Sequence, residues 1–212
     1  LSEGVTSLNK GVFRGLSQES IHLPKSLIHI DKDAFLDSSI QKITVEDNHP
    51  TYQLIDDVLY QGSTLFMVLP QYRQASFICP SFVEIISSKA FNHQQTIEEV
   101  TINNHVKSVH DDAFVNHHVR RLWYEGNGIE SLHKVFGHNP SLREVIYKNP
   151  VLSVNFFKGQ EHIEVVILQR IKYIDAYAFD GCKSLNNLTL DQSLLSIGDY
   201  AFHRCEQLSN II

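Results

Sequence analysis

The chain has 212 residues, which is enough for one sizeable core or two small ones. Hydrophobic residues make up 42% of it, and no apolar run approaches the ~18 residues that a membrane-spanning helix needs. A formal net charge of −6 argues against a nucleic-acid partner, because such affinity comes mostly from cationic side chains that meet phosphates. Three cysteines are too few for a disulfide-based scaffold.

A phenylalanine returns along the chain every 21 to 23 residues, apart from one gap of 56. Eight of the twelve phenylalanines follow this rule: Phe13, Phe35, Phe91, Phe114, Phe136, Phe157, Phe179 and Phe202. In five of the eight cases Ala precedes this marker. An apolar residue stands five positions before the marker except at Ser131, where Leu132 is the expected substitute. A fixed period of this length is the signature of a repeat architecture.

Short apolar-x-apolar stretches follow the markers in chain order. They cover residues 21–23, 43–45, 100–102, 122–124, 145–147, 166–168 and 188–190. Period 2 predicts a strand, and one strand in each repeat predicts a parallel sheet. A unit of about 22 residues cannot bury its apolar side alone, so neighbouring units are expected to stack. The phenylalanines would then form a buried internal ladder.

The gap of 56 residues predicts an insert at about residues 46–76. Within it, "DDVLYQ" (56–61) and "TLFMVL" (64–69) are strand-like and are joined by Gly62-Ser63, which indicates a β-hairpin. Two interpretations stay open. The hairpin is either a functional loop or padding on the side of the solenoid.

The units "LLSIGDYAFHRCEQLSNII" (194–212) and "IKYIDAYAFDGCKSLNNLTL" (171–190) resemble the BspA-like, or treponemal-type, leucine-rich repeat. The resemblance covers essentially the whole chain and implies an α/β repeat fold. This fold is a right-handed leucine-rich-repeat solenoid with a parallel concave β-sheet and, here, a β-hairpin insert. Residues 128–136 and 151–157 lack the Ala-Phe signature, so we expect irregular turns there. The family also implies a surface or secreted protein that takes part in adhesion.

No catalytic motif, cofactor site or metal site is predicted. The position three residues after each marker holds Leu16, Ser38, Gln94, His117, Asn139, Gln160, Cys182 and Cys205. Such variety indicates a structural role beneath a turn and not a redox or metal site. A disulfide between Cys182 and Cys205 is conceivable but not expected, and Cys79 falls at a core position. His93, His117 and His138 are interpreted as solvated turn residues, and glycosylation of Asn187 in "NLT" stays undecided because it falls on a strand.

We expect one solenoid over residues 1–212, as a fragment of a longer array, because the chain starts at Leu1 without a signal peptide and stops inside an apolar pattern. The predicted function is a non-enzymatic protein-binding or adhesion scaffold, at the cell surface or secreted. Its partner would be host matrix or another cell surface, and its oligomeric state is open. Two alternatives remain: a structural spacer or stalk, and the repeat region of an enzyme whose catalytic domain lies elsewhere. A spacer needs no apolar side chains on its open face.

The middle residue of each predicted strand points away from the core, because successive side chains alternate. In three consecutive units these residues are apolar, whereas Thr or His stands there at both flanks. An apolar centre that contains the only tryptophan, inside a charged rim, is typical of a binding hot spot. The predicted partner-binding residues are Trp123, Ile146, Ile167, Arg121, Glu144 and Lys148. The competing interpretation is a local shift of register, or loops that cover the tryptophan.

Overall fold

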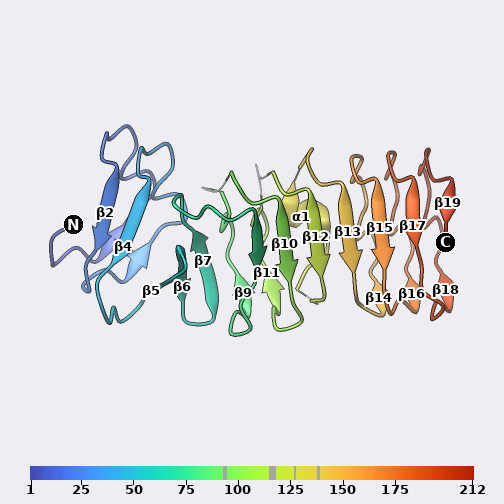
Figure 1. Cartoon of the computed structure of the whole chain (residues 1–212), viewed down its shortest axis with the longest axis horizontal. Coiled ribbons are helices and arrows are strands. Elements are labelled where there is room, and N and C mark those ends of the chain that lie inside the picture. Colours follow the sequence, from blue (N-terminus) through green and yellow to red (C-terminus); the bar gives the residue numbers. More distant parts are fainter. Residues whose placement is uncertain (93–94, 115–117, 127, 138) are drawn as a thin grey trace.

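Each coil of the chain contributes one strand to a parallel row that runs along the molecule, with the two termini at opposite ends (Figure 1). The structure is a computed structural model that describes residues 1–92, 95–114, 118–126, 128–137 and 139–212. This main row consists of β2 (Ser20–Leu23), β4 (Lys42–Val45), β8 (Ser76–Ile78), β10 (Glu99–Ile102), β12 (Arg121–Tyr124), β13 (Glu144–Tyr147), β15 (Val165–Leu168), β17 (Asn187–Thr189) and β19 (Asn210–Ile211). Strands β8 to β19 form a seven-stranded parallel sheet, and β2 pairs separately with β4. The predicted solenoid of stacked parallel strands is confirmed, and its handedness stays a prediction.

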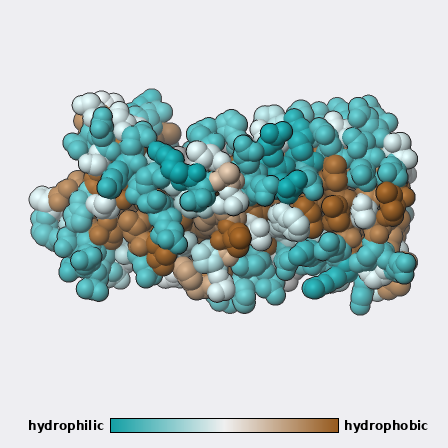
Figure 2. All heavy atoms as spheres, viewed as in Figure 1, coloured by the Kyte–Doolittle hydropathy of each residue, from teal (hydrophilic) through white to brown (hydrophobic). Residues whose placement is uncertain are grey.

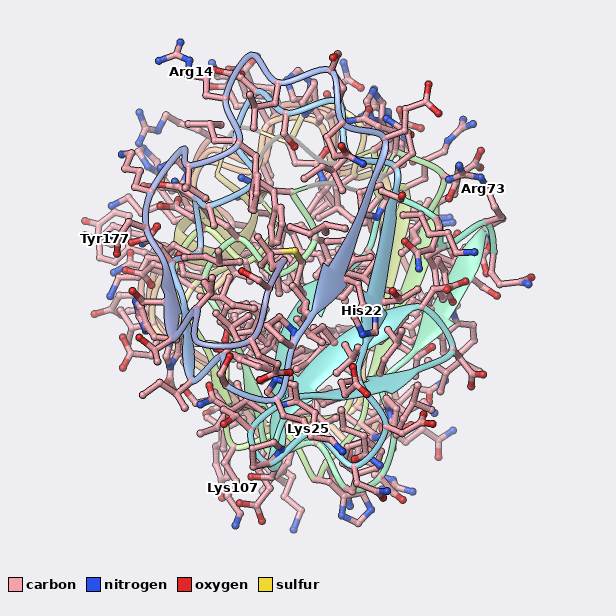
Figure 3. All side chains as sticks on the ribbon, turned by 90° about the vertical axis from the view of Figure 1, so that its left-hand side faces the viewer. Arg14, His22, Lys25, Arg73, Lys107 and Tyr177 are labelled. Atoms are coloured by element: carbon pink, nitrogen blue, oxygen red, sulfur yellow. The ribbon has the colours of Figure 1, made fainter. Side chains whose placement is uncertain are left out.

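A second row of two-residue strands lies on another side of the coil, and the sequence pattern did not predict it. These strands are β1 (Ser7–Leu8), β3 (His29–Ile30), β9 (Ile85–Ile86), β11 (Ser108–Val109), β14 (Val151–Leu152), β16 (Tyr173–Ile174) and β18 (Ser196–Ile197). Their second residue is the apolar residue five positions before the marker, and it is buried in every strand except β18. Figure 3 looks along the solenoid and shows Tyr177 and Arg73 projecting on opposite sides of it.

The marker phenylalanines stack on one another between neighbouring coils, as predicted. Their ring centroids are 4.2 Å apart for Phe91 and Phe114, 4.6 Å for Phe114 and Phe136, and 4.8 Å for Phe157 and Phe179. These five rings are fully buried. The aromatic stack therefore carries the core from one coil to the next.

The turns that hold the markers are not helical, which corrects the α/β class expected from the sequence. In six coils the residue two positions before the marker has a positive φ between 55° and 62°: Gly11, Lys89, Asp112, Asn155, Tyr177 and Tyr200. A residue in this left-handed region cannot continue a right-handed helix. The coils therefore close through turns, and the molecule is almost entirely a β-solenoid.

One coil is the exception, and it is one of the two in which we expected irregular turns. There α1 (Leu132–Phe136) replaces the turn, and it is the only helix among the described residues. Leu132 is fully buried, so it substitutes for Ser131 as expected. In the following coil the expectation was wrong, because Asn155 has the usual left-handed φ of 60° and Phe157 stacks regularly.

The strands of the insert lie between two hydrophobic cores. β5 (Gln53–Ile55), β6 (Val58–Gln61) and β7 (Thr64–Val68) pair antiparallel, and β7 then pairs parallel with β9. Alternate residues of β6 face opposite directions: Val58 and Tyr60 pack in the large C-terminal core, and Leu59 packs in the smaller N-terminal core. These strands therefore have an internal packing role.

The main row is interrupted between β4 and β8, and two consecutive side chains satisfy the exposed edges. Gln71 accepts a hydrogen bond from the Ile43 amide at 2.8 Å and donates one to the Ile43 carbonyl at 2.9 Å. Tyr72 donates its hydroxyl proton to the Ser76 carbonyl at 2.8 Å. An unpaired strand edge is a template for unwanted pairing, and these contacts occupy parts of both edges.

A buried ion pair joins the coils on either side of the insert. Asp33 contacts Lys89 at 2.6 Å and Lys10 at 3.4 Å, and its side chain is 8% exposed. The hydrogen bond from Lys89 holds the pKa of Asp33 below its usual value. Within the described residues, no helix is long and apolar enough to cross a membrane.

We predict that the phenylalanine stack dominates stability. Phe114→Ala and Phe179→Ala should each lower the free energy of unfolding by about 3–5 kcal/mol, because each removes a fully buried ring from a close-packed stack. Denaturant unfolding measures the loss. Phe82→Ala is the control, since Phe82 is 42% exposed, and should cost about 1 kcal/mol. Equal losses in the three variants would contradict the ladder.

We predict a pH-dependent contribution from Asp33. Its folded-state pKa is lowered, so the pair stabilises the fold above the unfolded-state value of about 4, and this is lost as the pH falls through the folded-state pKa. Asp33→Asn should cost about 1–3 kcal/mol at pH 7 and much less at pH 2. Asp37→Asn, which breaks an exposed pair with Arg14, should cost about 0.5 kcal/mol at pH 7. A pH-independent cost of Asp33→Asn would overturn the assignment.

Candidate functional site

The side chains of β12 alternate as the sequence predicted. Leu122 and Tyr124 are buried at 0% and 1% exposure, and Trp123 between them is 36% exposed. The Tyr124 hydroxyl accepts a hydrogen bond from the Ile129 amide at 2.8 Å, which fixes the buried ring. The register is therefore not shifted, and Trp123 points outward from the main-row sheet.

Trp123, Ile146 and Ile167 lie side by side on three neighbouring strands, in the register Trp123↔Ile146↔Ile167. Only part of this trio is open. Ile146 is 1% exposed and Ile167 is half-buried. Ile146 was expected on the open face, and its burial corrects that expectation. Ile146 lies between Trp123 and Ile167 of the neighbouring strands. Along its own strand direction it lies between the long charged residues Glu144 and Lys148, so its side chain is covered from every side.

Arg121 is fixed between two glutamates of the strands beside it. Its Nη1 lies 2.7 Å from Glu99 Oε1, and its Nη2 lies 2.8 Å from Glu144 Oε2. The hydrogen bond to Glu144 and the negative charges of both glutamates raise the pKa of Arg121. Sequence analysis named Arg121 and Glu144 and missed Glu99, although Glu99 occupies the position of Arg121 one coil earlier.

Lys148 borders the tryptophan on the other side. Its ammonium forms an ion pair with Glu125 and lies 5.6 Å from the centroid of the Trp123 ring. This distance is within the range of a cation–π interaction, which holds the indole in place. The described structure thus brings all six predicted residues to one face, and their role in binding stays a prediction.

The apolar centre belongs to a longer band on the main-row face. Figure 2 shows hydrophobic residues along the middle of this face, with hydrophilic residues on both sides. Ile78 on β8 is 71% exposed at the same position of its strand as Trp123. The face therefore offers apolar contact beyond the tryptophan.

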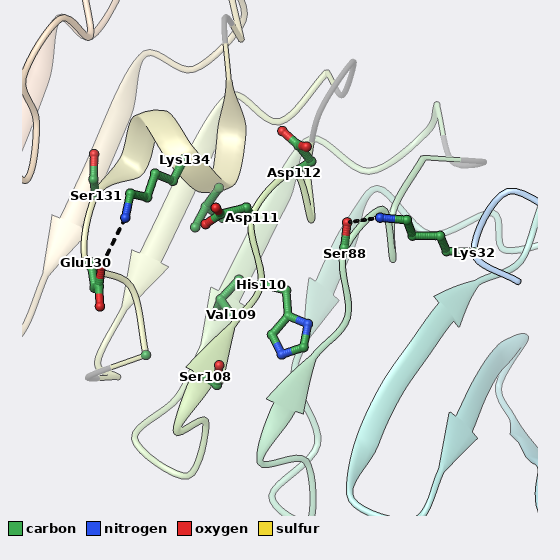
Figure 4. A pocket seen from close by; sticks show the side chains of 12 residues that line it. Lys32, Ser88, Ser108, Val109, His110, Asp111, Asp112, Glu130, Ser131 and Lys134 are labelled. Carbon is green, nitrogen blue, oxygen red and sulfur yellow. Dashed lines mark hydrogen bonds and ion pairs between the residues drawn. The ribbon is translucent and has the colours of Figure 1, made fainter.

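A polar groove of about 530 Å³ lies beside α1 and the second row (Figure 4). Its lining includes His110, Asp111, Asp112 and Glu130, with Lys134 paired to Glu130 at 3.1 Å. Across the described parts of the chain, no three His, Cys, Asp or Glu side chains come together in a way that could hold a metal ion. The histidines considered from the sequence, His93, His117 and His138, lie outside the described residues.

The repeated cysteine position has a structural role, as predicted. Cys182 Sγ donates to the Phe157 carbonyl at 3.1 Å, and Cys205 Sγ donates to the Phe179 carbonyl at 3.2 Å. Each thiol therefore binds the marker of the preceding coil. All three cysteines are free. Burial raises the pKa of Cys79 to about 12 and that of Cys205 to about 11, so neither thiol ionises readily at neutral pH.

Asn187 of the "NLT" sequence lies on β17, as expected. It is half-buried, and its Oδ1 is buried without a hydrogen-bond partner. A glycan on this amide would crowd the neighbouring strands β15 and β19. The geometry gives no support to modification at this residue.

The sequence pattern of the BspA type leucine-rich repeat region matches the chain in six copies, over residues 1–66, 63–155 and 150–212. No curated protein matches the chain.

Several solved structures are similar in fold. A leucine-rich repeat protein from Eubacterium ventriosum has a TM-score of 0.63 and 20% identity, over 94% of this chain and 62% of that one. A leucine-rich cell surface protein from Faecalibacterium prausnitzii has a TM-score of 0.54 and 23% identity, over 100% and 58%. The pneumococcal vaccine antigen PcpA has a TM-score of 0.53 and 18% identity, over 98% and 48%. The chain therefore spans less than two thirds of these structures.

We predict that the cysteines are unpaired and unreactive in the folded protein. A thiol reagent should find three thiols per chain after denaturation without reductant, because none is in a disulfide. In the native state at pH 8, Cys205 should react first and Cys79 and Cys182 slowly, because both of the latter are buried. Recovery of a single thiol after denaturation would establish a disulfide and contradict this prediction.

Proposed function

Because this chain belongs to the BspA-type leucine-rich repeat family, we propose that it is a non-enzymatic scaffold that binds a protein partner through the main-row face. The exposure of Trp123 is the observation that carries the proposal. This residue is the only tryptophan of the chain and is 36% exposed on β12, between the buried side chains of Leu122 and Tyr124. Trp is strongly enriched among the residues that dominate binding energy at protein interfaces.

The surroundings of Trp123 are ordered before any partner arrives. Lys148 is held over the ring by Glu125, and Ile146 beneath the surface gives the indole a firm apolar neighbour. Binding to such a site orders few additional side chains, so little conformational entropy is lost on association. The central β12 and β13 are paired on both edges, which also keeps the site rigid.

The charges of the rim indicate the chemistry of the partner. Glu99, Glu125 and Glu144 face Arg121 and Lys148, which leaves one negative charge in excess. We therefore propose a partner that places an apolar or aromatic side chain on Trp123 and Ile167 and a basic side chain beside the rim. Complementary charges of this kind set orientation and association rate.

Adhesion to host matrix or to another cell, by a surface-exposed or secreted protein, is the setting that we propose. Two observations support it: the Faecalibacterium prausnitzii structure is described as a cell surface protein, and PcpA is described as a vaccine antigen. The right-handed winding and the concave curvature of the main-row face belong to the same proposal. A structural spacer does not require an exposed tryptophan whose neighbouring side chains are held in place.

The test compares Trp123→Ala with Tyr173→Ala in binding to immobilised basement-membrane extract. Tyr173 is the matched control, because it is an exposed aromatic residue, 42% exposed, on the second row. Trp123→Ala should weaken attachment by about tenfold or more, and Tyr173→Ala should leave it unchanged. Both variants should unfold within about 1 kcal/mol of the wild type.

Two results would overturn the proposed function. The first is attachment of Trp123→Ala with wild-type affinity, which would favour the spacer. The second is an equal loss in Tyr173→Ala, which would place the contact on another side of the solenoid.

A further inference from the structure

A separate hollow of about 370 Å³ lies where the main-row strands β12 and β13 begin, and two arginines line it. Its polar lining consists of Gln95, Glu98, His118, Arg120, Ser141 and Arg143. Arg120 and Arg143 directly precede β12 and β13, so they occupy the same position in neighbouring coils. The Arg143 amide donates to the Arg120 carbonyl at 2.9 Å, which sets the two residues side by side.

Two like charges on neighbouring strands destabilise a sheet unless something neutralises them. The nearby cations have such partners: Arg121 contacts two glutamates, and Arg143 Nε contacts Glu164 at 3.1 Å. Arg120 is exposed, and no carboxylate contacts it within the described structure. All N–H donors of its guanidinium are therefore free at the rim of the hollow.

Further donors line the same hollow. The contacts of Arg143 with Glu164, Pro140 and Leu142 use its Nε and Nη1, which leaves Nη2. The Ser141 hydroxyl and the His118 ring make no hydrogen bond with the described residues, and both line the hollow. The Glu98 carboxylate is the one opposing charge. The formal charge of the lining is +1, from two arginines and one glutamate, in a chain of net charge −6.

We propose that this hollow binds one tetrahedral oxyanion, a sulfate or phosphate group. Guanidinium groups from two coils and a hydroxyl supply donors from several directions, which suits a tetrahedral group better than a planar carboxylate. Hydrogen bonds to an ionised acceptor are about twice as strong as neutral ones. The group is either a free ion or an ester on a sulfated polysaccharide. This site is distinct from the Trp123 face and does not depend on the function proposed for it.

The experiment titrates inorganic sulfate into the whole chain at low ionic strength, and backbone amide NMR shifts near Arg120 and Ser141 report binding. Sodium chloride at equal ionic strength is the reference. Arg120→Gln removes the free guanidinium. Arg170→Gln is the matched control, because Arg170 is also exposed and its side chain has no partner among the described residues. A second titration uses a heparin-derived tetrasaccharide.

Sulfate should bind saturably, Arg120→Gln should weaken this binding by about tenfold or more, and Arg170→Gln should leave it unchanged. Tighter binding of the tetrasaccharide, with the same loss in Arg120→Gln, would assign the site to a sulfated chain. Equal binding of both probes would assign it to the free ion. Shifts no larger with sulfate than with chloride, or equal losses in the two variants, would overturn the proposal.

Discussion

The contact between the marker phenylalanines of neighbouring coils is the interaction on which the rest of the structure depends. One coil contains two short strands and a turn and has no second layer of its own to cover its apolar side. Rings such as Phe114 are fully buried only because the coils before and after them stack against both faces. Stability is therefore built from contacts between neighbours, and every other feature has to keep the coils close and parallel.

The insert shows what is required where this stacking is interrupted. On β6, Val58 packs in one core and Leu59 in the other, so the apolar interior continues through the insert. Gln71 takes the hydrogen bonds that a neighbouring strand would give to Ile43, and Asp33 ties the coils together through Lys89. Side chains thus replace, one by one, the contacts that the regular repeat supplies through its backbone.

The period of the phenylalanines and the alternation in "LWY" were sufficient to predict the solenoid, its parallel main row and the outward direction of Trp123. The second row escaped prediction because two-residue strands show no alternation of their own. Left-handed residues such as Tyr177 escaped because a bulky side chain gives no signal for a positive φ, and they are the reason why helices are absent from those turns. The burial of Ile146 depends on how its neighbours pack, which spacing along the chain does not reveal.

The charges on the main-row face follow one rule, and its exception is informative. Cations on neighbouring strands are placed opposite carboxylates: Arg121 lies between two glutamates, and Lys148 pairs with Glu125. Such pairing across strands stabilises the sheet and leaves Trp123 as the exposed apolar group among paired charges. Arg120 departs from the rule: it lies between Glu98 of the preceding coil and Arg143 of the next, and no carboxylate contacts its guanidinium among the described residues. Among the described residues of this face, Arg120 is therefore a cationic position that no carboxylate contacts, and a ligand that carries negative charge would complete it.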